Sequence, residues 1–187
     1  MTTSKQPVRL YFFYHDDVDA STRRIVPRNY LDACINELRK ISGREFIVRF
    51  ITSVPGLTDI HYQGNPNYLL SEWRRLARDY AIKEDLPRTN TTRYVLVTKD
   101  KLDAITLGIA YFKESALVSS LVAYQTLAHE LGHSFGATHE DAELSHNAFG
   151  VTCETYVYPD RDERRANCYQ YSLKNRKNIA EFLDAFD

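Results

Sequence analysis

The chain has 187 residues, of which 43% are hydrophobic, and this is enough for one domain with a core of ordinary size. Its 24 basic and 25 acidic side chains nearly cancel, so no overall field attracts a nucleic acid or an anionic membrane. No apolar run approaches the length that crosses a bilayer. We therefore expect a domain with no nucleic-acid partner and no membrane insertion.

Alternating strand and helix patterns occupy the chain up to about residue 136. Aromatic and β-branched runs between turn residues predict strands, and apolar residues at helical spacing predict helices. The expected strands cover residues 8–14, 46–51, 94–98 and 107–112, and the expected helices cover residues 27–42, 69–80 and about 121–135. The opening strand–helix–strand order implies parallel pairing. Beyond residue 136 we expect an irregular segment and then a final helix near Asn175, a suitable N-cap.

Residues 129–139 read His-Glu-Leu-Gly-His-Ser-Phe-Gly-Ala-Thr-His. His129 and His133 are four residues apart, so they project from one face of a helix and can bind one metal ion. Glycine enters the left-handed region at little cost, so Gly136 allows a sharp turn that brings His139 round as a third ligand. Three imidazoles with an open fourth position are typical of catalytic zinc.

Glu130 lies beside these ligands and is the expected catalytic residue, because a carboxylate there can accept a proton from a metal-activated water. A bare HExxH pattern recurs by chance. Here the glycine and the third histidine also fall at the required offsets within one segment. The sequence therefore predicts one zinc ion (Zn²⁺) per chain, bound by His129, His133 and His139, with Glu130 as general base.

This segment resembles the zinc-binding segment of the metzincin metalloproteases, HExxHxxGxxH followed by an acidic residue, here Glu140. Its flanks are most similar to the adamalysin (reprolysin, or ADAM-type) branch, through Asp141, an edge strand at residues 107–112 and a closing helix at residues 175–183. The resemblance implies a metzincin-like α/β fold, with a twisted mixed sheet and helices in a larger N-terminal lobe. A small irregular C-terminal lobe would end in a helix, and zinc would lie in the cleft between the lobes. The expected lobes of this single catalytic domain, residues 1–187, are about 1–136 and about 137–187.

The activity of the family implies a zinc endopeptidase that hydrolyses peptide bonds of protein or peptide substrates. The substrate would then lie extended along the edge strand, against Gly108, Ile109 and Ala110. The alternative is a metzincin-like binding module that retains zinc with little or no turnover. The intact Glu130 argues against that alternative, because a protein without turnover has no chemical need for a general base.

One feature of the family is absent. Metzincins have a methionine beneath the metal, in a turn after the third histidine, whereas the only methionine of this chain is its first residue. Residues 155–159 resemble that turn, and their Val-Tyr-Pro sequence places Val157 at the floor of the site with Tyr158 beside it. Registers with Thr155 or Tyr156 at the floor also remain open. With Tyr156 there, Tyr158 corresponds to the tyrosine that astacins and serralysins use beside zinc.

Three cysteines are too few for a disulfide-dense scaffold. Cys34, on the first expected helix, is expected to be a buried thiol. Cys153 and Cys168 flank the turn at residues 155–159, and their spacing does not decide between a disulfide and two free thiols. A disulfide would imply an oxidising destination. Residues 1–7 lead into a strand pattern without an apolar leader, so we expect export by a leaderless or processed route, with a cytoplasmic location as the alternative.

Overall fold

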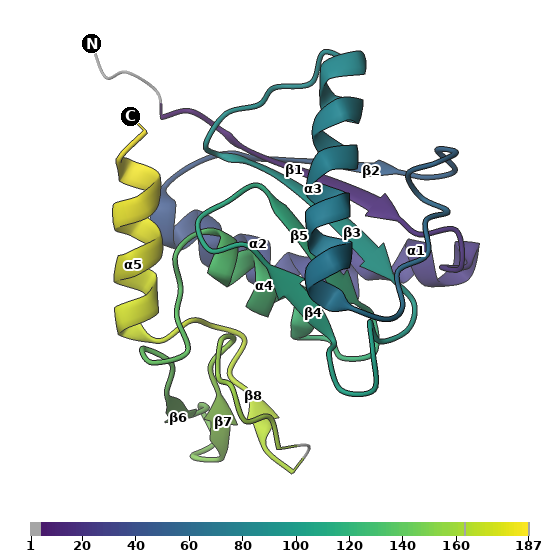
Figure 1. The fold of residues 1–187 in the computed structure, drawn as a ribbon. Coiled ribbons are helices and arrows are strands. Elements are labelled where there is room, and N and C mark those ends of the chain that lie inside the picture. The colour runs from purple at the N-terminus through teal and green to yellow at the C-terminus, as the bar shows by residue number, and fades with distance from the viewer. Residues whose placement is uncertain (1–4, 163, 187) are drawn as a thin grey trace.

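A five-stranded mixed sheet, in the order β2-β1-β3-β5-β4, forms the centre of the structure (Figure 1). The structure, a computed structural model, describes residues 5–162 and 164–186, so residues 1–4 of the N-terminal segment lie outside the described residues. The four parallel strands are β1 (Val8–Tyr14), β2 (Phe46–Ile51), β3 (Thr92–Thr98) and β5 (Ala116–Ser120). The short β4 (Gly108–Ala110) is antiparallel and forms one edge. The predicted α/β fold with a mixed sheet is confirmed.

Alternate side chains of β1 enter two cores, one on each face of the sheet. Leu10 and Phe12 pack in the core shared with the helix that carries His129 and His133, whereas Phe13 packs against Trp73 on the opposite face. A strand that is buried on both faces reads as a continuous apolar run. This is why residues 8–14 predict a strand so clearly.

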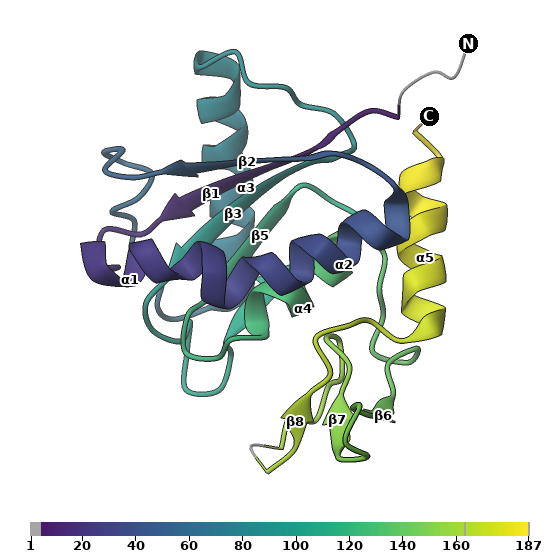
Figure 2. The same cartoon turned by 180° about the vertical axis from the view of Figure 1, so that it is seen from behind.

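The first helix begins earlier than predicted. It comprises α1 (Ala20–Val26), a π-helical turn η1 (Pro27–Leu31) and α2 (Asp32–Ser42), which form one run across the back of the sheet (Figure 2). Asp19 caps α1 by accepting two main-chain N–H groups of its first turn. Pro27 therefore lies inside a helical run, where the wider π turn accommodates a residue that has no N–H. The prediction that Pro27 opens the helix is wrong, because the cap at Asp19 was overlooked.

Helix α3 (Pro66–Lys83) also begins before the predicted residue 69. Asn65 caps it and Pro66 occupies its first turn, so the helix begins three residues before its predicted start. The buried residues of α3 cover the sheet face opposite α2 (Figures 1 and 2). None of the described helices has the length and apolar character that crossing a membrane requires.

The segment before the helix that carries His129 and His133 differs most from the prediction. Residues 116–120 form the buried strand β5, which was not predicted, and β4 is shorter than the predicted strand at residues 107–112. Helix α4 (Thr126–Ser134) begins after the predicted residue 121, and Tyr124, which falls inside the predicted helix, lies before α4 and is 55% exposed. A short buried strand followed by apolar residues cannot be told from a helix by periodicity alone.

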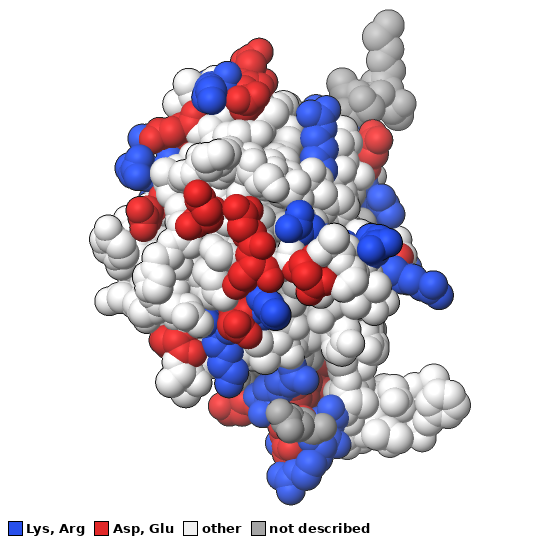
Figure 3. Space-filling model, turned by 90° about the vertical axis from the view of Figure 1, so that its right-hand side faces the viewer, with Lys and Arg blue, Asp and Glu red and all other residues white. Residues whose placement is uncertain are grey.

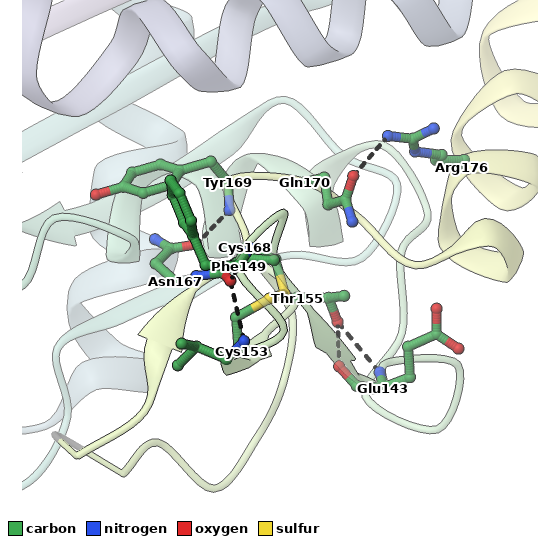
Figure 4. Close-up of a disulfide and its surroundings, with 11 residues drawn as sticks. Glu143, Phe149, Cys153, Thr155, Asn167, Cys168, Tyr169, Gln170 and Arg176 are labelled. Atoms are coloured by element: carbon green, nitrogen blue, oxygen red, sulfur yellow. Dashed lines mark hydrogen bonds between the residues drawn. A yellow bond between two sulfur atoms is a disulfide. The ribbon is translucent and has the colours of Figure 1, made fainter.

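The C-terminal part contains a small sheet where an irregular segment was predicted. Its strands are β6 (Leu144–His146), β7 (Thr152–Glu154) and β8 (Ala166–Asn167). A Cys153–Cys168 disulfide joins β7 to the residue after β8 (Figure 4). Of the two alternatives, a disulfide or two free thiols, the disulfide is the one that forms. Cys34 is a buried free thiol, as predicted.

The last helix, α5 (Leu173–Asp184), is capped by Ser172 rather than by the predicted Asn175. The Ser172 hydroxyl accepts the N–H of Asn175, and the amide side chain of Asn175 binds the main chain of Thr138 instead. This contact ties α5 to the loop that follows α4. The division into two lobes near residue 136 stays a prediction.

Candidate metal centre

Helix α4 and the loop after it bring three histidines together. The Nε2 atoms of His129, His133 and His139 form a triangle with sides of 3.0, 3.0 and 3.1 Å. His129 and His133 project from successive turns of α4, and His139 approaches from the loop. The three residues singled out in the sequence therefore converge on one point.

The turn that carries His139 back to the helix is a Schellman motif. The N–H of Ala137 donates to the carbonyl of Gly132, and the N–H of Gly136 donates to the carbonyl of His133. Gly136 has a φ of +99°, a conformation that strains any side chain. A Cβ at this position would also lie 2.8 Å from Cε of Lys113. The predicted role of Gly136 in the turn is confirmed.

Main-chain carbonyls fix the orientation of two of the rings. Nδ1 of His129 lies 3.0 Å from the carbonyl oxygen of Tyr156, and Nδ1 of His133 lies 2.9 Å from that of Ala137. A carbonyl oxygen only accepts, so each Nδ1 carries the proton and each Nε2 presents a lone pair to the triangle. Lone pairs 3.0 Å apart repel one another unless a cation lies between them. Zinc, which binds imidazole nitrogen at about 2.0–2.1 Å, fits a triangle of this size.

His129 and His133 are held in the neutral form that binds metals. Burial and the two neighbouring imidazoles lower the pKa of His129 to about 3. Burial also lowers the pKa of His133. A donor set made only of imidazoles suits zinc and other transition metals better than calcium or magnesium, which prefer oxygen.

Glu130 is buried between α4 and the edge strand β4. Its burial raises the pKa of its carboxyl group to about 8. A Cβ on Gly108 would lie 2.7 Å from Cγ of Glu130 and 2.8 Å from its Oε1. A side chain at position 108 would therefore displace the carboxylate, which gives this glycine a role that the sequence analysis missed.

A cavity of about 230 Å³ opens beside His129 and Glu130. Gly108 forms part of one wall, and Tyr158 and Arg161 form part of another. From Gly108 the strand continues through Ile109 and Ala110, which are half-buried and pair only with β5 among the described residues. The outer edge of β4 thus remains open to an added strand.

Two residues of the turn predicted to underlie the metal are buried beneath α4. Val157 is fully buried, and its Cγ2 lies 2.9 Å from where a Cβ on Gly132 would be. The ring of Tyr156 packs on Tyr171 instead, and its carbonyl accepts from His129. Tyr158 lines the cavity. This packing agrees with the Val157 register, which stays a prediction.

Val157→Met is expected to change the free energy of unfolding by no more than about 1.5 kcal/mol, because both side chains are apolar and differ modestly in volume. Val157→Asp should bury a charge beneath α4 and lower both stability and zinc retention. Urea unfolding and zinc analysis measure the two effects. If Val157→Asp has no effect while Tyr156→Asp removes stability and zinc, Tyr156 forms the floor.

Three contacts that hold the centre left no signal in the sequence. The buried Arg93 donates to the carbonyl of Ser134 at the end of α4, at 2.6 Å. The hydroxyl of Tyr171 donates to a carbonyl of α4 at 2.7 Å. The side-chain amide of Asn175 accepts a hydrogen bond from the N–H of Thr138 and donates one to its carbonyl, just before the third histidine. These residues lie far from the motif in the chain, so no local spacing reveals them.

Comparison with known proteins identifies the family. The sequence profile of Metallo-peptidase family M12 matches residues 86–180, slightly more than half of the chain. The chain belongs to this family. A search of curated proteins finds no match to this M12 peptidase-family chain. The family agrees with the expected resemblance to zinc metallopeptidases, while the adamalysin branch stays a prediction.

Two solved structures are similar to this M12-family chain. Metalloproteinase-II from Bacteroides fragilis has a TM-score of 0.60 and 15% sequence identity over 97% of this chain. This chain spans 55% of the length of that protein chain. A zinc-dependent peptidase from Methanocorpusculum labreanum has a TM-score of 0.47 and 16% identity, over 91% of this chain and 99% of that one. The first similarity supports the fold described above.

Proposed function

We propose that this M12-family protein is a zinc-dependent endopeptidase that hydrolyses peptide bonds of protein substrates. One observation carries the proposal: three Nε2 atoms converge within 3.1 Å beside the buried carboxylate of Glu130. Membership of a metallopeptidase family supports the reaction class. The name of the structurally similar metalloproteinase agrees with it.

His129, His133 and His139 would hold one zinc ion per chain. Zinc bound by three imidazoles supplies Lewis-acid activation of water for attack on a carbonyl carbon. The carbonyls of Tyr156 and Ala137 orient two of the rings so that Nε2 is the nitrogen that faces the metal position, because each carbonyl accepts the Nδ1 proton. The protein thus supplies a preorganised donor set.

Glu130 would move the proton that the reaction releases. Its carboxylate would accept a proton from the attacking water and pass it to the leaving amine. Among the described residues no hydrogen bond occupies this carboxylate, so its oxygens are free to take that proton. The close contact with Gly108 restricts the positions that the side chain can adopt.

The edge strand β4 would bind the substrate. An extended peptide would add antiparallel to Gly108, Ile109 and Ala110, so that main-chain hydrogen bonds position the bond to be cut. The cavity lined by Tyr158 beside Glu130 would take the side chain that follows this bond.

The disulfide supports a proposed destination outside a reducing compartment. Cys153 and Cys168 are bonded in the structure, and such bonds persist mainly in oxidising environments. We therefore propose export of this protein to an oxidising compartment.

The test is metal analysis combined with mass spectrometry of peptides released from a mixed proteome. We expect about one zinc per chain and new internal cleavage sites. A chelator should abolish cleavage, and added zinc should restore it. Cleavage that continues unchanged in chelator would contradict the proposal.

A further inference from the structure

A second cavity, distinct from the one beside Glu130, has five basic residues among the twelve that line it. Its volume is about 320 Å³, and it lies between α3, the start of β3 and the β4–β5 turn. One lining residue is acidic, Glu114, and it pairs with Arg74 at 3.1 Å. The basic lining residues are Arg74, Arg78, Arg88, Arg93 and Lys113.

Arg93 brings a buried positive charge to the wall of this cavity. Its side chain is 1% exposed, and its guanidinium donates to the carbonyls of Asn90, Thr92 and Ser134 and to the Ser134 hydroxyl. All of these acceptors are neutral. Within residues 5–162 and 164–186 no carboxylate forms an ion pair with Arg93 or Arg88. Burial without a counter-charge lowers the pKa of Arg93 to about 9.

One group of acidic side chains lies at the other end of the sheet. Asp16 follows the carboxyl end of β1, and Asp100 follows that of β3. Figure 3 views the molecule from the carboxyl ends of the parallel strands and shows acidic side chains across the middle of that side. The cationic cavity lies where β3 begins. The seven residues of β3 separate the two ends by about 23 Å. This exceeds two Debye lengths at physiological salt, so the distant carboxylates do little to offset the positive charge.

We propose that this cavity binds a small, multiply charged oxyanion of the phosphate or sulfate class. Guanidinium groups present paired N–H donors that match the oxygens of such anions. The hydroxyl residues Thr89 and Ser115 line the same walls. Two of the five basic lining residues have carboxylate partners, Arg74 with Glu114 and Arg78 with Asp79. The positive charge that remains favours a multivalent anion over a single carboxylate. The volume lies at the lower end of the range for small-molecule sites, about 300–1,000 Å³.

The cavity is linked to the last turn of the metal-binding helix. Arg93 binds Ser134 there, and the main-chain N–H of Lys113 donates to the carbonyl of His133 at 3.1 Å. An anion held by both residues would bridge the two segments that support this turn. Binding should therefore raise the melting temperature, because a ligand that binds only the folded state stabilises it.

The test is titration calorimetry of the full chain with its metal, using inorganic sulfate and inorganic phosphate at constant ionic strength set with sodium chloride. The wild type should bind one anion saturably. The double variant Arg78→Gln, Arg88→Gln should bind at least tenfold more weakly. Arg75→Gln is the matched control, because Arg75 is an exposed residue of the same helix that does not line the cavity.

Arg75→Gln should bind within twofold of the wild type, and its melting temperature should rise with the anion to the same extent. Absence of saturable binding would overturn the proposal. Equal loss in the control and the double variant would also overturn it, because it would indicate general screening of charge. An anion held at the metal centre instead would bind all three proteins equally.

Discussion

Glu130→Gln is expected to lower kcat/KM for peptide cleavage by about 10²- to 10⁴-fold, the usual contribution of a positioned general acid–base group. Glutamine has nearly the same shape as glutamate, so the packing against Gly108 should survive. The substitution also removes a carboxyl group that burial disfavours in its charged form. Zinc content and melting temperature should therefore remain close to those of the wild type, while the rate falls.

The matched control is Glu140→Gln, which neutralises an exposed carboxylate next to His139. This variant should keep most of the activity. Undiminished cleavage by Glu130→Gln would remove Glu130 from the mechanism. If the wild type retains zinc but cleaves no faster than Glu130→Gln, the protein is a zinc-binding module, the alternative that the missing methionine first suggested.

The candidate metal centre was predictable because its residues are close together in the chain. All three histidines and Glu130 lie within eleven consecutive residues, and helical geometry converts their spacing into convergence. The left-handed turn at Gly136 follows from residue type in the same way. The supports of the centre were not predictable, since Arg93 and Tyr171 reach α4 from distant elements.

The errors in the fold have a common physical origin. Three helices begin where a side chain caps them, at Asp19, Asn65 and Ser172, while the apolar spacing became visible only later in each helix. The strand β5 is too short for its period to show, and it is buried along its whole length, so apolar and polar residues do not alternate in it. Boundaries are therefore set by individual hydrogen bonds, whereas the order of the elements follows from the hydrophobic pattern.

His139→Ala should lower zinc occupancy and melting temperature together. His139 is exposed and lies on a loop, so loss of its side-chain packing should cost little, about 0.5 kcal/mol or less. Loss of the bound metal should lower the free energy of unfolding by a larger amount. A ligand present at one hundred times its Kd stabilises a protein by about 2.7 kcal/mol, which corresponds to roughly 5–10 °C for a domain of this size.

Thermal melts with and without chelator separate the metal from the side chain itself. Without chelator the variant should melt well below the wild type, and in excess chelator the two should melt together, because both then lack zinc. His146→Ala, which removes an exposed histidine of β6 outside the triangle, should match the wild type in both conditions. A difference that persists in chelator would mean that His139 stabilises the loop and not the metal. Full zinc content in His139→Ala would show that two histidines of α4 suffice to hold the ion.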